Sequence, residues 1–315
     1  MSGGTYKFTG DEIILIALTR LHWPLAWNNA VKEFPGRMRW DLQKAFKWFL
    51  DFMIVNWAYL IVNNREYWLP FFPIHAEAMR NKLAALPREE NRQFFPHADD
   101  PNGGYRVAFL IDDTIIAINR VGGGPREGGE MAPRVPIEVQ QAWWTGWKKL
   151  HGLKWQTVDM PNGMNFDVWG PISVRRNDNY ALHHSDIENK LRTLQQDQQL
   201  KFAMLGDSAF SNSDVMCSGG GRGMAAIREP IEWDYKDLKT MWKYLDYKHV
   251  LHLKKQPVAK IVFVCMLLRN AHVCMNGNQM AQYFHCQPPS FEHWVGRGPR
   301  AKSIPGDIIF SNNQN

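Results

Sequence analysis

Cysteine is scarce in this chain of 315 residues, and its scarcity narrows the classes of protein to consider. The four cysteines, Cys217, Cys265, Cys274 and Cys286, do not form the dense pattern of a disulfide framework. A reducing, intracellular compartment is therefore the simpler expectation. Cys274, His285 and Cys286 also lack the spacing of any common zinc site. The sequence thus predicts neither a disulfide-stabilised scaffold nor a zinc-binding module.

Long uninterrupted apolar runs are missing as well. The longest, residues 261–268, is far shorter than the roughly 20 residues that span a bilayer as a helix. Asp11 and Glu12 interrupt the N-terminal segment, so it does not have the pattern of a secretory signal. From these two absences we expect a soluble protein that has no membrane partner.

The sequence also lacks a phosphate-binding loop, although it is basic overall. The glycine triplets at residues 122–124 and 219–221 are not followed by the Lys and Ser or Thr that such a loop requires. Lys and Arg number 37 against 31 Asp and Glu, which leaves a formal net charge of +6. This excess suits an anionic partner such as nucleic acid, but it does not determine the fold.

The first hundred residues are dominated by helical spacing of apolar side chains. Helices are expected over residues 11–21, 40–62 and 76–86. A polar loop at residues 88–104, with two prolines and a glycine pair, is the best candidate for a domain boundary. We therefore predict three parts: an N-terminal helical domain over residues 1–100, a second domain over residues 101–287 and a C-terminal tail over residues 288–315.

Strand-like runs begin after this loop. Strands are expected over residues 107–118, 153–158, 164–169 and 202–206, with a Gly/Pro loop at residues 125–136. Asn162 and Gly163 separate the second and third of these strands, which is a strong signal for a β-hairpin. A mixed sheet flanked by helices is the expected α/β architecture, because strands and helices alternate along this part of the chain.

Two helices are expected within the same region. The first covers residues 185–194, with Ser185 as its N-cap and Glu188 completing a capping box. The second follows a glycine-rich loop at residues 218–223 and covers residues 229–245. An antiparallel hairpin followed by a helical crossover is how an RNase H-like sheet begins.

Carboxylates follow two of the expected apolar runs. Asp112 and Asp113 come directly after residues 107–111, and Asp207 comes directly after residues 202–206. A charge at the end of a buried run is costly unless it is paired or binds a metal ion. Hard divalent cations such as Mg²⁺ prefer oxygen ligands of this kind. The alternative interpretation is an ordinary turn residue at each position.

Glu232 is the third candidate carboxylate. It lies next to a stripe of apolar residues on the expected helix, close to the helix start that Pro230 favours. Its alternative role is a surface ion pair with Lys236, four residues further along the helix.

Basic and aromatic side chains alternate between residues 143 and 155. The basic members are Lys148, Lys149, His151 and Lys154, and the aromatic members are Trp143, Trp144, Trp147 and Trp155. Such a pattern is typical of a nucleic-acid groove, but a strand with one buried face has it too. Arg175 and Arg176 form a second basic pair. The three lysines and the two arginines are candidates for contacts with DNA phosphates.

At this point several motifs resemble those of PIF/Harbinger-type transposases, the DDE superfamily endonucleases. Residues 111–114 (IDDT) stand where the family has I-D-G-T, and residues 206–210 (GDSAF) are similar to G-D-S-A-Y. Residues 140–156 resemble the block Y-x-G-x-K-K-x-H-G-L-K-x-Q, and residues 228–233 (REPIEW) resemble R-x-x-x-E-W. The resemblance runs in order through most of the chain, and it implies an RNase H-like sheet.

The resemblance implies a catalytic triad of Asp112, Asp207 and Glu232. These carboxylates would hold two divalent ions, Mg²⁺ or Mn²⁺. One ion would activate water or a DNA 3′-hydroxyl, and the other would stabilise the leaving oxygen. Arg228 and Lys239 would contact phosphates or orient Glu232.

Two alternatives for the ligands remain open. Asp113 stands where the family has Gly, so Asp112 and Asp113 could exchange roles. Asp178 lies in another block that resembles the family, and it would either support the site from outside or replace Asp207 as the second ligand.

The expected function follows from this resemblance. It is DNA cleavage and strand transfer at terminal inverted repeats, in the nucleus, with a Myb-like DNA-binding partner and a homo-oligomeric assembly as further expectations. The alternatives are a domesticated DNA-binding protein without cleavage activity, and a nuclease that acts on RNA or on a DNA–RNA hybrid.

Overall fold

The computed structural model describes residues 8–62, 65–95, 105–121, 135–247, 251–253 and 255–296. Most of the Gly/Pro loop expected at residues 125–136 lies outside the described residues. So do the second half of the polar loop at residues 88–104 and the part of the tail beyond residue 296. The division into three parts therefore stays a prediction.

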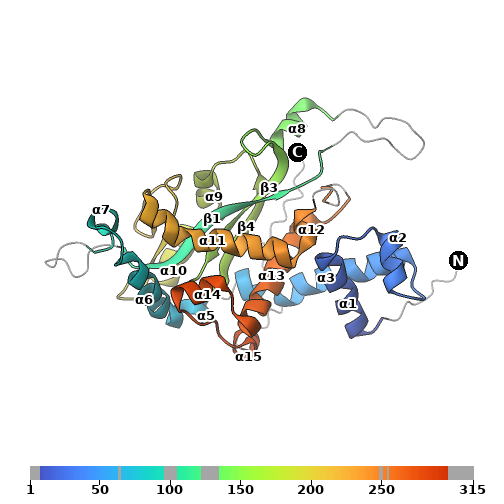
Figure 1. Cartoon of the computed structure of the whole chain (residues 1–315), viewed down its shortest axis with the longest axis horizontal. Coiled ribbons are helices and arrows are strands. Elements are labelled where there is room, and N and C mark those ends of the chain that lie inside the picture. Colours follow the sequence, from blue (N-terminus) through green and yellow to red (C-terminus); the bar gives the residue numbers. More distant parts are fainter. Residues whose placement is uncertain are drawn as a thin grey trace.

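In the described part of the chain, a mixed sheet of six strands lies at the centre (Figure 1). The strands are β1 (Val107–Ala117), β2 (Trp144–Thr145), β3 (Leu150–Asp159), β4 (Asn165–Ser173), β5 (Ala203–Gly206) and β6 (Met216–Ser218). Strand β3 is antiparallel to β1, β2 and β4, whereas β5 is parallel to β1 and β6 is parallel to β5. The predicted mixed sheet is confirmed.

Strand β1 is the central element for the candidate site. Its apolar run is buried from both faces: Phe109 and Ile111 belong to one hydrophobic cluster, and Leu110 belongs to another. This alternation follows from the two-residue period of a strand. The strand then continues to Ala117, because β3 pairs with it along this whole stretch. The strand expected over residues 107–118 is therefore confirmed, and Asp112, which follows its apolar run, lies in the middle of β1 and not at a strand end.

The predicted β-hairpin joins β3 and β4. The backbone N–H of Met160 donates to the carbonyl of Met164 at 2.9 Å, and that of Gly163 donates to the carbonyl of Met160 at 2.8 Å. Gly163 has a φ of +82°, and a Cβ atom there would lie 2.0 Å from Oδ1 of Asn278. Glycine is thus required both by the backbone conformation and by the close approach of a second segment.

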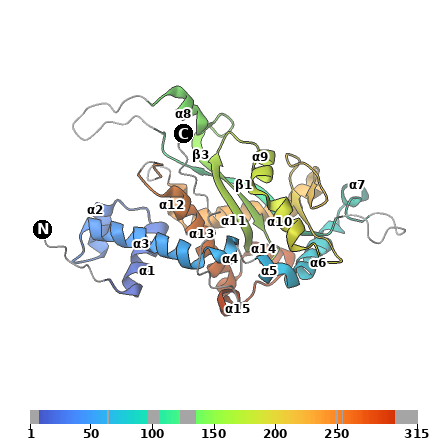
Figure 2. The same cartoon turned by 180° about the vertical axis from the view of Figure 1, so that it is seen from behind.

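Helices cover both faces of the sheet. In the second half of the chain they are α8 (Ile137–Ala142), α9 (Asp178–Ser185), α10 (Ile187–Leu194), α11 (Arg222–Met241), α12 (Lys243–Asp246), α13 (Val258–Asn276), α14 (Gln279–Phe284) and α15 (Phe291–Gly296). Helix α11 crosses in front of β1 in Figure 1, and α10 lies in front of the sheet in the reverse view of Figure 2. The sheet is therefore an inner layer between helices.

The N-terminal residues are helical, as predicted, but they form more and shorter helices. The α-helices are α1 (Gly10–His22), α2 (Trp27–Ala30), α3 (Arg39–Trp57), α4 (Tyr59–Val62), α5 (Arg65–Trp68), α6 (Phe72–Leu83) and α7 (Arg88–Asn91), with 3-10 turns η1 (Val31–Glu33) and η2 (Leu69–Phe71). Phe72 of α6 is fully buried, and its ring lies 4.8 Å from that of Phe109 in β1. The N-terminal helices thus share a hydrophobic core with the sheet.

Two predicted helix starts are wrong. Ser185 ends α9 instead of capping the next helix, and Asp186, with a φ of +57°, separates α9 from α10. Glu188 completes no capping box, because its side chain accepts hydrogen bonds from Arg192 and Ser213. Helix α11 begins at Arg222, earlier than expected, so Pro230 lies inside the helix and does not start it.

Among the described residues, two helical segments are long and apolar enough to cross a membrane by length and composition, Arg39–Val62 and Val258–Asn276. Half of the first apolar window and 61% of the second are buried inside the fold. The core helices of soluble proteins pass the same test, so this is weak evidence for a membrane segment. The second segment shows that the short apolar run at residues 261–268 belongs to a much longer core helix.

Candidate active site

Three elements place the predicted triad in one region. Asp112 lies in β1, and the parallel strand β5 pairs Leu205 with Leu110 before it ends at Gly206. Asp207 therefore leaves the sheet at about the level of Asp112. Helix α11 packs against β1 and carries Glu232. The parallel register of β1 and β5 therefore brings the two aspartates together.

These carboxylates line one pocket of about 650 Å³. Asp113 and Asp178 line the same pocket, so all five carboxylates singled out in the sequence meet there. The other lining residues are Thr114, Ile115, Trp147, Lys148, Lys154, Tyr235, Lys236, Lys239, Thr240, Lys243 and Asp246. The pocket thus combines carboxylates with a group of lysines.

Asp112 shows the electrostatic consequence of this crowding. Burial raises its pKa to about 7, although the backbone N–H of Asp113 donates to its Oδ1 at 2.7 Å and opposes the shift. The carboxylates of Asp207, Asp178 and Glu232 raise the pKa further. A cation in the pocket would offset this accumulation of negative charge.

Asp113 has a different set of neighbours. Its carboxylate forms an ion pair with Lys154 at 3.2 Å, and Lys154 also donates to Oδ1 of Asp178 at 2.6 Å. Burial raises the pKa of Asp113 to about 8, Lys154 lowers it and Asp178 raises it. Lys154 is only 7% exposed. Its ammonium group therefore faces these two carboxylates and is not exposed to solvent as a free phosphate contact would be.

Whether this pocket suits divalent ions depends on which side-chain atoms could bind them. Within the ranges described above, no group of three or more His, Cys, Asp and Glu side chains is arranged to hold a metal ion. The triad shares a pocket without forming a closed cluster of ligands. The donors of the triad are nonetheless all carboxylate oxygens, and Asp113, whose Oδ2 pairs with Nζ of Lys154 at 3.2 Å, lines the same pocket. This chemistry suits a hard cation such as Mg²⁺ or Mn²⁺.

The predicted phosphate contacts divide into two groups. Lys148, Lys154 and Lys239 line the pocket. Arg228, Lys149, Arg175 and Arg176 do not contribute to its lining. The ammonium group of Lys239 donates to the carbonyl of Ile115 at 3.1 Å, and burial lowers its pKa.

Two further lysines of the pocket were missed by the sequence reasoning. Lys236 and Lys243 line it beside Lys239. The sequence spacing could have indicated such lysines. Lys236 and Lys239 follow Glu232 by one and two helical turns, so they share its face of the helix. Lys236 was considered only as a surface partner of Glu232, and the described part of the structure has no ion pair between these two side chains.

Comparison with known proteins adds a second kind of observation. Residues 130–270 match a family model described as DDE superfamily endonuclease. This region is similar to DDE endonucleases. No curated protein and no solved structure matches the chain. The match supports a transposase-like nuclease domain, and residues 130–270 are called the DDE-like region below.

The DDE-like region contains part of the candidate site. Asp178, Asp207 and Glu232 lie inside it, and so do the lysines of the pocket. Asp112 lies outside it, because β1 precedes residue 130. The association of Asp112 with the other carboxylates therefore comes from the fold, through the pairing of β1 with β3 and β5.

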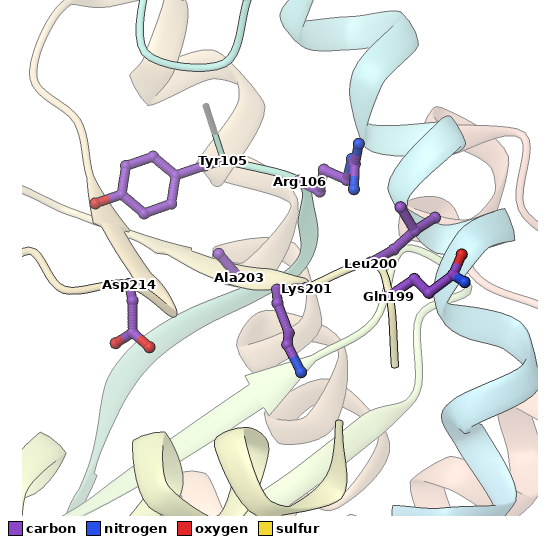
Figure 3. Close-up of a pocket in the computed structure, with 7 residues that line it drawn as sticks. All are labelled: Tyr105, Arg106, Gln199, Leu200, Lys201, Ala203 and Asp214. Atoms are coloured by element: carbon purple, nitrogen blue, oxygen red, sulfur yellow. The ribbon is translucent and has the colours of Figure 1, made fainter. Parts of the chain in front are cut away.

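A second pocket, of about 410 Å³, lies where β1 and β5 begin (Figure 3). Its polar side chains do not converge: Arg106 and Lys201 point away from each other, and so do Tyr105 and Gln199. The hydroxyl of Tyr105 donates to the carbonyl of Ser213 at 2.6 Å, so it is already engaged within the fold. This pocket lacks the convergence of charges that distinguishes the first one.

Tyr235 connects helix α11 to the two central strands. Its hydroxyl donates to the backbone carbonyl of Asp112 at 2.9 Å and lies 2.8 Å from Oγ1 of Thr157. Glu232 is three residues earlier on the same helix. The hydroxyl of Tyr235 therefore helps to hold the helix that carries Glu232 against the strand that carries Asp112.

The substitution Tyr235→Phe is expected to lower the free energy of unfolding by about 1–3 kcal/mol, because it removes the donor of the Asp112 carbonyl and the hydroxyl contact with Thr157. Chemical denaturation of the purified protein would measure this change. Tyr283→Phe is the matched control, since the Tyr283 hydroxyl has no hydrogen bond among the described residues, and a change within about 0.5 kcal/mol is expected there. Equal effects of the two substitutions would contradict the role of the Tyr235 hydroxyl.

Proposed function

We propose that this chain is a metal-dependent DNA endonuclease of the transposase type, with Asp112, Asp207 and Glu232 as ligands of divalent ions. The observation that carries the proposal is the meeting of these carboxylates, from β1, from the residue directly after β5 and from α11, in one pocket with several lysines. The DDE-like region, which contains two of them, supports the same reaction class.

The strand order supports an RNase H-like fold as part of the proposal. Strands β4, β3 and β1 form an antiparallel meander, and β5 and β6 then add in parallel on the other side of β1. Helices α9 and α10 make the crossover between β4 and β5. Acidic residues on β1 and directly after β5 then lie next to each other, as a nuclease of this type requires.

The proposed membership of the PIF/Harbinger group rests on the sequence blocks at residues 111–114, 140–156, 206–210 and 228–233. With it come further proposals: terminal inverted repeats as the DNA substrate, strand transfer after cleavage, a Myb-like partner, a homo-oligomer and a nuclear location. The basic charge of the chain is in keeping with a DNA substrate.

The carboxylates and the lysines of the pocket would have different roles in the reaction. Bound divalent ions would supply a polarised nucleophile and stabilise the leaving oxygen. Asp112, Asp207 and Glu232 would hold these ions at the end of β5. Lys148, Lys236 and Lys243 would attract and hold the DNA phosphates at the rim of the pocket.

Asp112 is proposed as the ligand in preference to Asp113. Successive residues of a strand point to opposite faces, so Asp112 and Asp113 have different neighbours although both line the pocket. The charges of Asp207 and Glu232 raise the pKa of Asp112, whereas the charges that shift the pKa of Asp113 most are those of Lys154 and Asp178. Asp113 and Asp178 are therefore assigned to the support of the site, held there by Lys154.

The test is a nicking assay on supercoiled plasmid DNA that carries terminal inverted repeats. The protein is expected to convert the plasmid to the open circular form in Mn²⁺ or Mg²⁺, and EDTA is expected to abolish the conversion because the ligands alone provide no Lewis acid. Restoring Mn²⁺ in excess of EDTA should recover nicking. Activity that persists in EDTA would contradict a metal-dependent reaction.

A DNA-binding protein without cleavage activity is the second candidate. It is favoured by one observation: the carboxylates do not form a closed ligand cluster in the described residues. Binding of the plasmid in a gel-shift assay, without nicking in either metal ion, would support this candidate. Nicking of RNA or of a DNA–RNA hybrid, but not of DNA, would instead support a nuclease of different specificity.

A further inference from the structure

Trp147 is the most exposed large apolar side chain in the described part of the chain, with 82% of its surface accessible. It lies in the turn between β2 and β3, and it lines the same pocket as the candidate carboxylates. Burying an indole contributes more to stability than burying almost any other side chain. An indole left this exposed beside the pocket therefore indicates a surface that a ligand could cover.

The turn that carries Trp147 is well anchored. Strands β2 and β3 pair Trp144 with His151 and Thr145 with Leu150. Lys149 closes the turn with a φ of +50°, and the backbone N–H of Gly152 donates to the carbonyl of Trp143 at 2.8 Å. The indole of Trp147 is thus held outward by a defined hairpin.

The tryptophans of this segment have different roles. Trp155 is buried in the core, with 1% of its surface exposed. Trp144 packs against the ring of His151 at 5.1 Å. Trp147 instead makes a cation–π contact, since Nζ of Lys148 lies 4.7 Å from the centroid of its ring. Of the aromatic residues in this basic segment, Trp155 is therefore a buried strand residue, whereas Trp147 is exposed beside the cation of Lys148.

We propose that Trp147 is a stacking platform for an unpaired nucleobase of the DNA that occupies the carboxylate pocket; this inference rests on the proposed function. An unpaired base offers a free π-face, whereas the bases of an intact duplex are covered by their neighbours. Aromatic side chains beside a basic groove bind single-stranded nucleic acid in this way. Lys148 supplies the adjacent positive charge for the backbone phosphate.

The charge around Trp147 favours a nucleic acid over an apolar protein segment as the ligand. Lys148 lies beside the indole, and Lys236 and Lys243 line the same pocket. An apolar segment would have to desolvate these ammonium groups without pairing them, which is costly. A nucleotide supplies both a ring for the indole and a phosphate for the lysines.

Trp147 lies outside the fixed positions of the block that this segment resembles. In the family block Y-x-G-x-K-K, Lys148 and Lys149 stand at the two fixed lysines, whereas Trp147 stands at the unspecified position before them. The stacking platform therefore adds a contact that the motif itself does not prescribe.

The test uses two DNA probes in EDTA, so that no cleavage takes place. One is a duplex with a short unpaired 3′ end that carries 2-aminopurine, and the other is the same duplex fully paired. Trp147→Ala is expected to weaken binding of the first probe about 5- to 100-fold, and to change binding of the second much less. Trp147→Phe should retain most of the affinity. Quenching of 2-aminopurine by the parent protein should be lost in Trp147→Ala.

Trp144→Ala is the matched control, because Trp144 lies in the same hairpin but does not line the pocket. The Trp144→Ala variant is expected to bind the probe with the unpaired 3′ end as tightly as the parent protein does. Equal affinities of the parent and Trp147→Ala would overturn the inference, as would an equal loss for both probes. The nicking assay on plasmid DNA reports separately on the proposed function, so stacking without nicking, or nicking without stacking, identifies which of the two has failed.

Discussion

Asp112→Asn is expected to abolish DNA nicking while the protein stays folded. The substitution keeps the shape of the side chain but removes the negative charge that would hold a divalent ion. Charge stabilisation by a metal ion contributes several kcal/mol to a transition state, so a loss of at least about a hundredfold in rate is expected. Burial already raises the pKa of Asp112 to about 7, so a neutral amide at this position should be well tolerated by the fold. Rates of plasmid nicking in Mn²⁺ and a thermal melt of each variant would measure the two effects.

Asp207→Asn and Glu232→Gln are expected to have the same effect as Asp112→Asn. Because the three carboxylates would act as one unit, a double variant should be no slower than the slowest single variant. Glu229→Gln is the matched control for Glu232→Gln. Glu229 lies three residues earlier in α11, accepts a hydrogen bond from Trp233 and does not line the pocket, so its nicking rate should equal that of the parent.

The decisive comparison is between neighbours in β1. Asp113→Asn is expected to retain measurable nicking, because Asp113 is paired with Lys154. If Asp113→Asn abolishes nicking and Asp112→Asn does not, then the assignment of the ligand to Asp112 is wrong. If none of the triad variants affects nicking by an active parent protein, then the pocket is not the active site.

Arg269→Met is expected to lower the free energy of unfolding by about 3–5 kcal/mol, which is typical of removing one member of a buried ion pair. Arg269 is 1% exposed, and its guanidinium lies 2.6 Å from Oδ1 of Asp234 and donates to the carbonyl of Gly163 at 2.9 Å. Burial raises the pKa of Asp234, and Arg269 opposes that shift. Without the guanidinium, Asp234 and the buried Asp159 lose their common positive partner.

Urea denaturation of the parent and of Arg269→Met would measure this loss. Arg192→Met is the matched control: Arg192 pairs with Asp214 at 2.6 Å, but at a position where 37% of its side chain is exposed. Exposed ion pairs contribute about 0–1 kcal/mol, so a loss within this range is expected for the control. A loss below about 1 kcal/mol for Arg269→Met would show that the buried network does not stabilise the fold.

The network of Arg269 also matters for the site. Asp234 lies two residues after Glu232 in α11, Gly163 lies in the turn between β3 and β4, and Arg269 belongs to α13. Asn278 adds a further contact, since its amide donates to Asp234 at 3.0 Å. One guanidinium therefore fixes the helix that carries Glu232 relative to the sheet that carries Asp112.

Local features were predictable because they depend on residues that are near in the chain. The turn at Asn162 and Gly163 and the strand at residues 107–118 follow from turn chemistry and from a continuous apolar run. The limits of α11 were missed because Pro230 was taken as the start of a helix, whereas the helix begins eight residues earlier at Arg222. The capping role given to Ser185 failed for a similar reason, since that residue ends the preceding helix.

By itself, the sequence determined the α/β class, the helical character of the N-terminal part and the blocks that resemble DDE endonucleases. These properties follow from the periodicity of apolar side chains and from short sequence motifs. Only the tertiary structure decided which carboxylates share a pocket, because their approach depends on the register of β1 with β5 and on the packing of α11 against β1. It also decided that Lys154 is a buried partner of Asp113 and Asp178 and that Trp147 is exposed, because the environment of a side chain depends on segments distant in the sequence.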